Sequence, residues 1–155
     1  MRYRTLGRTD LSVAPLCLGG NVFGWTADER RSFAVLDAYM DGGGNFLDTA
    51  DTYSAWLPGH VGGESESILG RWMRARNNRD RVILATKVGS RMGTAPDAYG
   101  LSRRYIVEEV EASLRRLQTE YIDLYLGRIA MIQRHHLRRR WRLLIPWCVR
   151  AKCAL

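Results

Sequence analysis

Acidic residues are missing from the last 29 positions of this 155-residue sequence, and lysine is scarce throughout it. Residues 127–155 hold eight of the 24 basic residues and none of the 16 acidic ones, so residues 1–126 are electrically balanced. The formal net charge of +8 therefore belongs to these last residues alone. A basic surface over the whole protein, which is typical of nucleic-acid-binding domains, is not indicated.

Long apolar runs and paired cysteines are lacking as well. No stretch approaches the roughly 18 continuous apolar residues of a membrane span, and no charged-then-apolar leader opens the chain. Cys17, Cys148 and Cys153 have neither metal-site nor disulfide-framework spacing. These absences predict a cytoplasmic protein with free thiols and no metal site.

The scarcity of lysine makes one residue conspicuous. The chain has 22 arginines but only two lysines, and Lys87 is the single lysine of residues 1–126. It directly follows the apolar run "VILAT", where a charged side chain is expected to be buried and therefore paired. Lys87 is accordingly a candidate functional residue.

Short apolar runs alternate with helical patterns along residues 1–126. In four of these runs the apolar residues follow one another instead of alternating with polar residues, which is typical of strands buried on both faces. They are "APLCLGG" (14–20), "NFLDTA" (45–50), "RVILATKV" (81–88) and "YIDLYL" (121–126). The opening "MRYRTLGRTDLSVAP" predicts a small hairpin that turns at residues 7–10. A strand–helix period of about 30–40 residues predicts right-handed βαβ units and a parallel sheet.

Three helices are predicted between these strands. The first begins at a capping box formed by Thr26 and Glu29, and it ends at the glycines of "DGGG" (41–44). The second covers about 65–76, and the third begins after Ser102 as its N-cap. Apolar residues recur at helical spacing in each.

Two architectures fit such a parallel sheet. A doubly wound sheet normally shows G-x-G-x-x-G after its first strand, and "LGGNVFG" (18–24) is glycine-rich without matching that pattern. In a (β/α)₈ barrel the functional residues lie at the carboxyl ends of strands. Here Asp48 ends the second predicted strand and Lys87 the third, and Gly20 and Asn21 follow the first. The α/β barrel is favoured. A whole barrel needs about 250 residues, so we expect only the hairpin and the first four βα units, which make half a barrel.

Asp48, Tyr53 and Lys87 are the candidate catalytic residues. If they meet at one mouth, Lys87 can pair with Asp48 and present its ammonium to the phenol of Tyr53. A nearby cation stabilises the phenolate, so Tyr53 can protonate a carbonyl oxygen while hydride reaches the carbon from a nicotinamide. Structural alternatives stay open, with Asp48 as a turn former and Tyr53 as a packing residue.

Several ordered motifs in residues 1–126 resemble the aldo-keto reductases, in particular the bacterial members. They are "NFLDTADTY" (45–53), "GESESILGRWM" (63–73), "VILATKVG" (82–89), "SLRRLQTEYIDLYL" (113–126) and the opening "MRYRTLGRTDLSVAPLCLGG". The resemblance implies NADPH-dependent reduction of an aldehyde or ketone on a (β/α)₈ barrel. It assigns proton donation to Tyr53, tuning of Tyr53 to Lys87 and orientation of Lys87 to Asp48. It also places Gly20, Asn21 and Asp48 beside the nicotinamide.

One position departs from the family pattern. In the family, "DLYL" leads within two residues to a histidine that orients the substrate carbonyl, whereas position 128 here is Arg128. His135 and His136 stand in an unrelated context, and His60 is interpreted as a surface or substrate-rim residue. In the family, most of the pocket for the cofactor's phosphate and adenine comes from later strands. We therefore expect little or no turnover by this chain itself.

Residues 127–155, called the basic tail below, have three interpretations. The clustered arginines and interleaved tryptophan of "RHHLRRRWR" (134–142) suit a nucleic-acid tether. An apolar helix face between Ile129 and Leu144 suits attachment to a membrane surface. The third interpretation is a reading-frame slip near residue 127.

The genetic code allows the third interpretation to be examined. Read one nucleotide back, Met131 followed by Ile132 encodes aspartate, and permitted synonymous codons make the tail similar to the family's continuation. A histidine then arises across Arg128 and Ile129. This interpretation is favoured, with residues 1–126 as the reductase half barrel and the basic tail outside the fold. The expected partner is a small carbonyl substrate rather than nucleic acid or a membrane, with self-association through exposed sheet edges.

Overall fold

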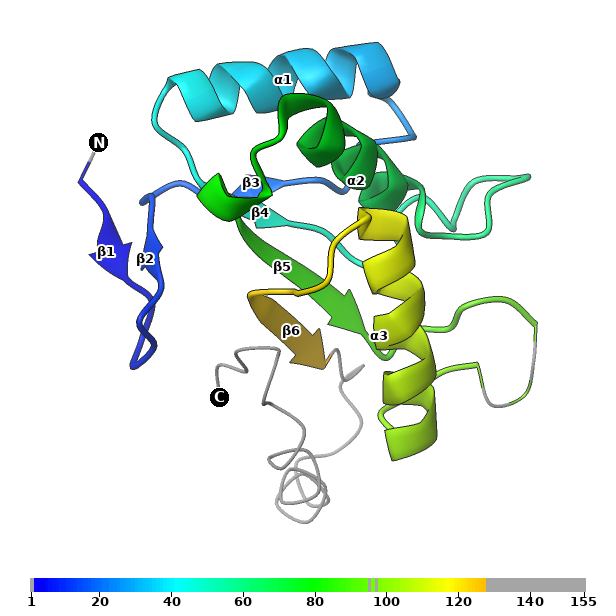
Figure 1. Ribbon diagram of the computed structural model, residues 1–155. Helices are drawn as coiled ribbons and strands as arrows, with labels where there is room; N and C mark the ends of the chain where they lie inside the picture. Colours follow the sequence, from blue (N-terminus) through cyan, green and yellow to red (C-terminus); the bar gives the residue numbers. More distant parts are fainter. Residues whose placement is uncertain (1, 95, 97, 128–155) are drawn as a thin grey trace.

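The computed structural model describes residues 2–94, 96 and 98–127 (Figure 1). The strands within these residues are β1 (Arg4–Thr5), β2 (Ser12–Val13), β3 (Leu18–Gly19), β4 (Phe46–Asp48), β5 (Ile83–Val88) and β6 (Leu124–Gly127). The helices are α1 (Glu29–Asp41), α2 (Glu64–Arg76) and α3 (Arg103–Leu117), with a 3₁₀ turn, η1 (Arg79–Arg81), before β5. This order confirms the predicted alternation of strands and helices.

Strands β3 to β6 form one parallel sheet in sequential order, and β1 and β2 form a separate antiparallel hairpin. The hairpin is fixed to the amino end of β4 by Asn45, whose side-chain amide donates to the carbonyl of Ser12 and accepts from the amide of Ala14. The parallel sheet and the hairpin are therefore as predicted. Within the described residues, β3 and β6 are the edges of the parallel sheet.

The helix boundaries follow the predicted signals with one correction. Ser102 caps α3, because its Oγ accepts from the amide of Tyr105, as expected. The prediction that Thr26 caps α1 was wrong: the cap is Asp28, which accepts from the amide of Arg31. Asp28 lies one residue before the first helical position, so its carboxylate reaches the free amides of the first turn directly. After α1, Gly43 adopts the left-handed conformation (φ 83°).

The three helices cover one side of the parallel sheet (Figure 1). Leu47 of β4 pairs in register with Leu84 of β5, and both side chains are buried in the core against the helices. This core also contains one or more fully buried side chains from each helix: Leu36, Leu69, Trp72 and Leu117. Because side chains alternate along a strand, Asp48 and Lys87 project from the opposite face.

Residues 128–155 lie outside the described residues. Gly127, the first residue of the basic tail, is the last residue of β6. The expectations for Arg128, His135, His136 and the rest of the basic tail remain predictions. In the part of the chain that is described, no helix is long and apolar enough to cross a lipid bilayer.

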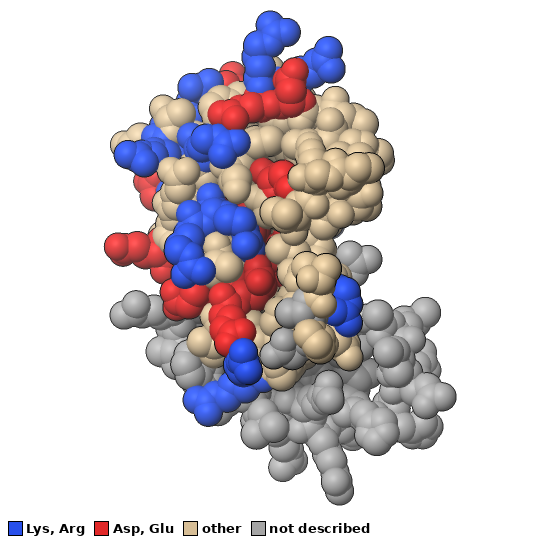
Figure 2. All heavy atoms as spheres, turned by 90° about the vertical axis from the view of Figure 1, so that its right-hand side faces the viewer, with Lys and Arg blue, Asp and Glu red and all other residues tan. Residues whose placement is uncertain are grey.

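Charges of both signs are interspersed on the face of the molecule shown in Figure 2. Two bidentate contacts join helices across this fold: Arg71 of α2 with Glu29 of α1, and Arg76 of α2 with Asp37 of α1. This mixture agrees with the electrical balance of residues 1–126.

Candidate active site

Asp48 and Lys87 come together at the carboxyl ends of adjacent strands. Asp48 is the last residue of β4 and lies opposite Ala85 of β5, so Lys87 lies two residues further along on the same face. The Lys87 ammonium lies 2.6 Å from Oδ2 of Asp48. The side chains of Lys87 and Asp48 keep only 20% and 25% of their surface exposed, which shields the pair from solvent.

Lys87 also holds Tyr53, the third predicted residue. Its Nζ donates to Oη of Tyr53 at 2.8 Å and to the carbonyl oxygen of Thr49 at 3.0 Å. An ammonium has three protons, so these two contacts and the one to Asp48 use all of them. Tyr53 Oη in turn donates to Oδ2 of Asp48 over a longer distance of 3.2 Å. The predicted meeting of Asp48, Tyr53 and Lys87 is therefore found.

The turn that carries Tyr53 is fixed on both sides. The amide of Asp51 donates to the carbonyl of Lys87 at 3.2 Å. Ser54 is fully buried and adopts a left-handed conformation (φ 72°), which is unusual for a residue with a side chain. Its Oγ donates to the carbonyl of Phe23 at 3.1 Å, and this contact helps to hold the strained conformation.

The residues expected beside the nicotinamide lie next to Asp48. Gly20 is buried, and its amide donates to the carbonyl of Asp48 at 2.7 Å. A Cβ at Gly20 would lie 2.9 Å from Oγ of Ser65, so close packing requires glycine there. Gly19 pairs in register with Asp48 and is exposed, and Asn21 is exposed as well.

A buried polar layer lies between the helices and the sheet, and the sequence patterns did not reveal it. Glu66 of α2 accepts from Thr86 of β5 at 2.6 Å and from Arg116 of α3 at 2.6 Å. Arg116 also donates to Glu109 and Ser113 on its own helix. Glu66 and Arg116 lie 50 positions apart, and an apolar periodicity does not mark polar residues, so the sequence patterns do not show this network.

Asp51 faces this layer and is 1% exposed. Its Oδ2 has no hydrogen-bond partner among the described residues. Burial is the main reason that the pKa of Asp51 rises to about 7, and the negative charges of Glu109 and Glu66 raise it further. On β6, the burial of Tyr125 is the main cause that raises the pKa of its hydroxyl, and the negative charge of Asp51 is the second.

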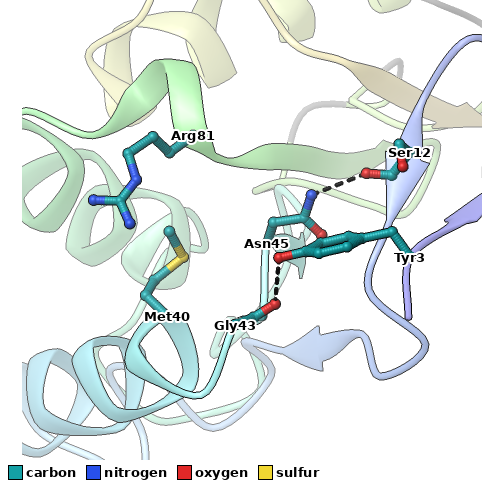
Figure 3. Close-up of a pocket in the computed structure, with 7 residues that line it drawn as sticks. Tyr3, Ser12, Met40, Gly43, Asn45 and Arg81 are labelled. Carbon is teal, nitrogen blue, oxygen red and sulfur yellow. Dashed lines mark hydrogen bonds between the residues drawn. The ribbon is translucent and has the colours of Figure 1, made fainter. Parts of the chain in front are cut away.

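A pocket of about 370 Å³ lies at the other end of the sheet (Figure 3). Asn45 precedes β4 and Arg81 precedes β5, so the pocket is at the amino ends of the strands. Tyr3 closes one side, where its hydroxyl donates to the carbonyl of Gly43. This pocket is separate from Asp48, Tyr53 and Lys87, and none of the three lines it.

His60 does not join the three residues by any described contact. Its Nδ1 lies 3.7 Å from Oε1 of Glu64, at the start of α2. The side chain is 31% exposed. This partly exposed position leaves the interpretation of His60 as a surface or substrate-rim residue unchanged.

A comparison with known families identifies the family of this chain. The sequence profile of the aldo/keto reductase family matches residues 15–129, which is most of the described chain. The chain belongs to the aldo/keto reductase family. The match includes the motifs that carry Asp48, Tyr53 and Lys87.

This family member is similar in sequence to proteins of bacteria and of a fungus. The uncharacterized oxidoreductase YrpG of Bacillus subtilis is 41% identical over 152 residues, covering 95% of this chain and 42% of its own length. Norsolorinic acid reductase B of Aspergillus parasiticus is 41% identical over 137 residues, covering 79% and 34%. An uncharacterized 11.2 kDa protein of Pseudescherichia vulneris is 57% identical over 91 residues, covering 58% and 88%.

A solved aldo-keto reductase has the same fold over part of its length. AKR11C1 from Bacillus halodurans, solved in its holo form, superposes with a TM-score of 0.68 at 40% identity. The match covers 82% of this chain and 40% of that structure. This aldo/keto reductase chain thus spans about two fifths of YrpG and of the solved structure.

Proposed function

We propose that residues 1–126 carry the proton-donating part of an aldo-keto reductase site, in which an aldehyde or ketone is reduced with hydride from NADPH. The single observation that supports this most strongly is the Lys87 ammonium, placed within 2.8 Å of both Asp48 and Tyr53. Membership of the aldo/keto reductase family supports the reaction class.

The contacts around Tyr53 explain how it would donate a proton. The Tyr53 proton is held by Asp48 at 3.2 Å, the longest of the contacts that join the three side chains, so an incoming carbonyl oxygen can compete for it. When the proton has moved to the carbonyl oxygen, Lys87 stabilises the phenolate left on Tyr53. Asp48 balances the charge of Lys87 and keeps its ammonium directed at Oη.

The residues beside Asp48 fit the nicotinamide end of NADPH, which supplies hydride when it is bound. A Cβ added to Gly19 would meet only Oδ1 of Asn21, at 3.7 Å, so the strand offers an open, flat strip there. Gly19, Gly20 and Asn21 would line that end of the cofactor, with Asp48 next to them.

The sheet is proposed to be half of a (β/α)₈ barrel, with residues 1–127 as the reductase unit, because β6 ends at Gly127, and with residues 128–155 outside it. Two observations support this proposal: the strands run in the order β3-β4-β5-β6 without interruption, and they match part of a solved aldo-keto reductase. Exposed β3 and β6 edges would favour self-association.

A hybrid protein tests the proposed reaction. Residues 1–127 of this chain replace the corresponding segment of YrpG, and NADPH oxidation is followed with a series of aldehydes and ketones. We expect turnover by the hybrid, a loss of about 10²-fold or more in kcat for Tyr53→Phe, and near-background turnover by the 155-residue chain alone. An active hybrid in which Tyr53→Phe leaves kcat unchanged would refute the assignment.

A further inference from the structure

Two tryptophans that the proposed reaction does not use lie beside Tyr53. Trp25 is in the loop between β3 and α1, and Trp56 is in the loop between β4 and α2. Their ring centroids are 5.5 Å apart at an interplanar angle of 83°. The Trp56 ring also meets the ring of Tyr53, at 6.3 Å and 63°. The three rings therefore form a continuous aromatic surface that begins at the proposed proton donor.

Much of this surface is open to solvent. Trp25 is 46% exposed and Trp56 is 51% exposed. Large apolar side chains that are grouped and exposed usually mark a binding site, because single exposed residues are common but clusters are not. Other exposed aromatic residues have polar or cationic contacts instead: Tyr3 bonds to a carbonyl, and Tyr121 stacks on Arg79 at 3.8 Å.

The loop that carries Trp25 is held in place by α2. Gly24 has φ 79°, and a Cβ there would lie 2.9 Å from Cβ of Glu64, so the loop packs closely on the start of that helix. The amide of Trp25 donates to the carbonyl of Val22 at 3.1 Å. Trp25 is thus set beside Trp56 before any ligand arrives, which lowers the entropy lost on binding.

We infer that Trp25 and Trp56 select flat aromatic carbonyl compounds as the substrate class. Two rings at nearly right angles form a corner, where a flat ring can stack on one indole face and meet the other edge-on. A carbonyl group on such a ring can reach Oη of Tyr53, because Tyr53 adjoins Trp56. A saturated ring system of the same size is thicker and gains only the burial of its surface. This inference rests on the proposed carbonyl site.

Indole N–H signals of the ¹⁵N-labelled 155-residue chain test the inference without cofactor. The ligands are 2-acetylnaphthalene and its fully saturated analogue 2-acetyldecahydronaphthalene, ketones of the same carbon skeleton. Trp25→Phe and Trp56→Phe assign the two signals. Trp72 is the internal reference, because it is fully buried and its Nε1 donates to Asp37 at 2.8 Å.

We expect the naphthyl ketone to shift the Trp25 and Trp56 signals, to leave Trp72 in place, and to bind about tenfold more tightly than the saturated ketone. Trp56→Ala is expected to remove this preference, and an unchanged Trp72 signal would show that the variant is folded. Equal affinity for both ketones overturns the inference. Shifts that depend on protein concentration, with no response to either ketone, also overturn it and assign the aromatic surface to contact between copies of the chain.

Tyr53→Phe separates this inference from the proposed function. The preference for the naphthyl ketone is expected to survive in this variant, because the aromatic surface keeps its rings. If the preference is absent while the hybrid loses activity with Tyr53→Phe, the proposed reaction stands and the aromatic substrate class fails. If the preference is present and the hybrid with Tyr53→Phe keeps its activity, the aromatic substrate class stands and the proposed reaction fails.

Discussion

The ammonium of Lys87 lies 2.6 Å from a carboxylate oxygen of Asp48, on the neighbouring strand. The two residues are 39 positions apart in the chain, and the parallel register of β4 and β5 brings them together. Because the contact is three-quarters or more shielded from solvent, the charge of Asp48 acts on Lys87 with less screening than a surface pair would have. This contact sets the direction in which Lys87 meets Tyr53.

Asp48→Asn in the YrpG hybrid is expected to lower kcat by about tenfold to 10²-fold and to leave the KM for the carbonyl substrate nearly unchanged. The amide keeps the shape but loses the charge that orients Lys87, while Thr49 and Tyr53 still accept two of its protons. Asp28→Asn is the matched control, because asparagine caps a helix as well as aspartate does. An equal loss in both variants would contradict the role given to Asp48.

Removal of Arg116 is expected to destabilise the fold strongly. Glu66 is completely buried and pairs with Arg116, so Arg116→Ala leaves a buried carboxylate without its cation. We expect the free energy of unfolding to fall by about 3–5 kcal/mol in urea titrations. Arg71→Ala is the control, since its pair with Glu29 is about half exposed and contributes at most about 1 kcal/mol. Similar losses in the two variants would show that the buried network contributes little.

Asp51 is expected to make stability fall as pH rises. Its pKa is about 7 in the folded chain and 3.8 as an ordinary carboxyl, so between these values the folded chain holds a proton that the unfolded chain releases. Its contribution is complete below about pH 4, is lost between about pH 4 and 7, and is on the order of 4 kcal/mol.

Urea titrations of the wild type and Asp51→Asn across this range measure the effect as the difference between two curves. Asp37→Asn is the control, because Arg76 lowers the pKa of Asp37 and any loss there comes as pH falls. Parallel curves for the wild type and Asp51→Asn would contradict the buried, protonated state of Asp51.

The sequence was sufficient to predict that Asp48 and Lys87 meet, because both lie at the carboxyl ends of neighbouring strands. Apolar runs locate the strands, and the carboxyl ends of parallel strands share one edge, so Asp48 and Lys87 were expected to meet there. Contacts of backbone groups could not be predicted in this way. The carbonyl of Thr49, which accepts a hydrogen bond from Lys87, belongs to the backbone, and a pattern of side chains does not indicate it.

The polar layer behind the sheet could not be predicted for a different reason. Glu109 and Ser113 of α3 are polar and do not belong to the apolar pattern that predicts the helix, yet both are buried because Arg116 donates a hydrogen bond to each. The role of Gly70 on α2 could not be predicted from the sequence either. A Cβ there would lie 2.3 Å from the carbonyl oxygen of Arg116, so glycine permits a close approach of α2 and α3 that only the folded chain reveals.

A double-mutant cycle on Tyr53 and Lys87 in the YrpG hybrid tests the central claim most directly. If Lys87 acts by stabilising the phenolate of Tyr53, Tyr53→Phe removes the group on which Lys87 acts. We predict that Tyr53→Phe and Lys87→Met each lower kcat by about 10²-fold or more, and that the double variant is within a few-fold of the slower single variant. Losses that multiply in the double variant, or a Lys87→Met variant with normal kcat, would contradict the account.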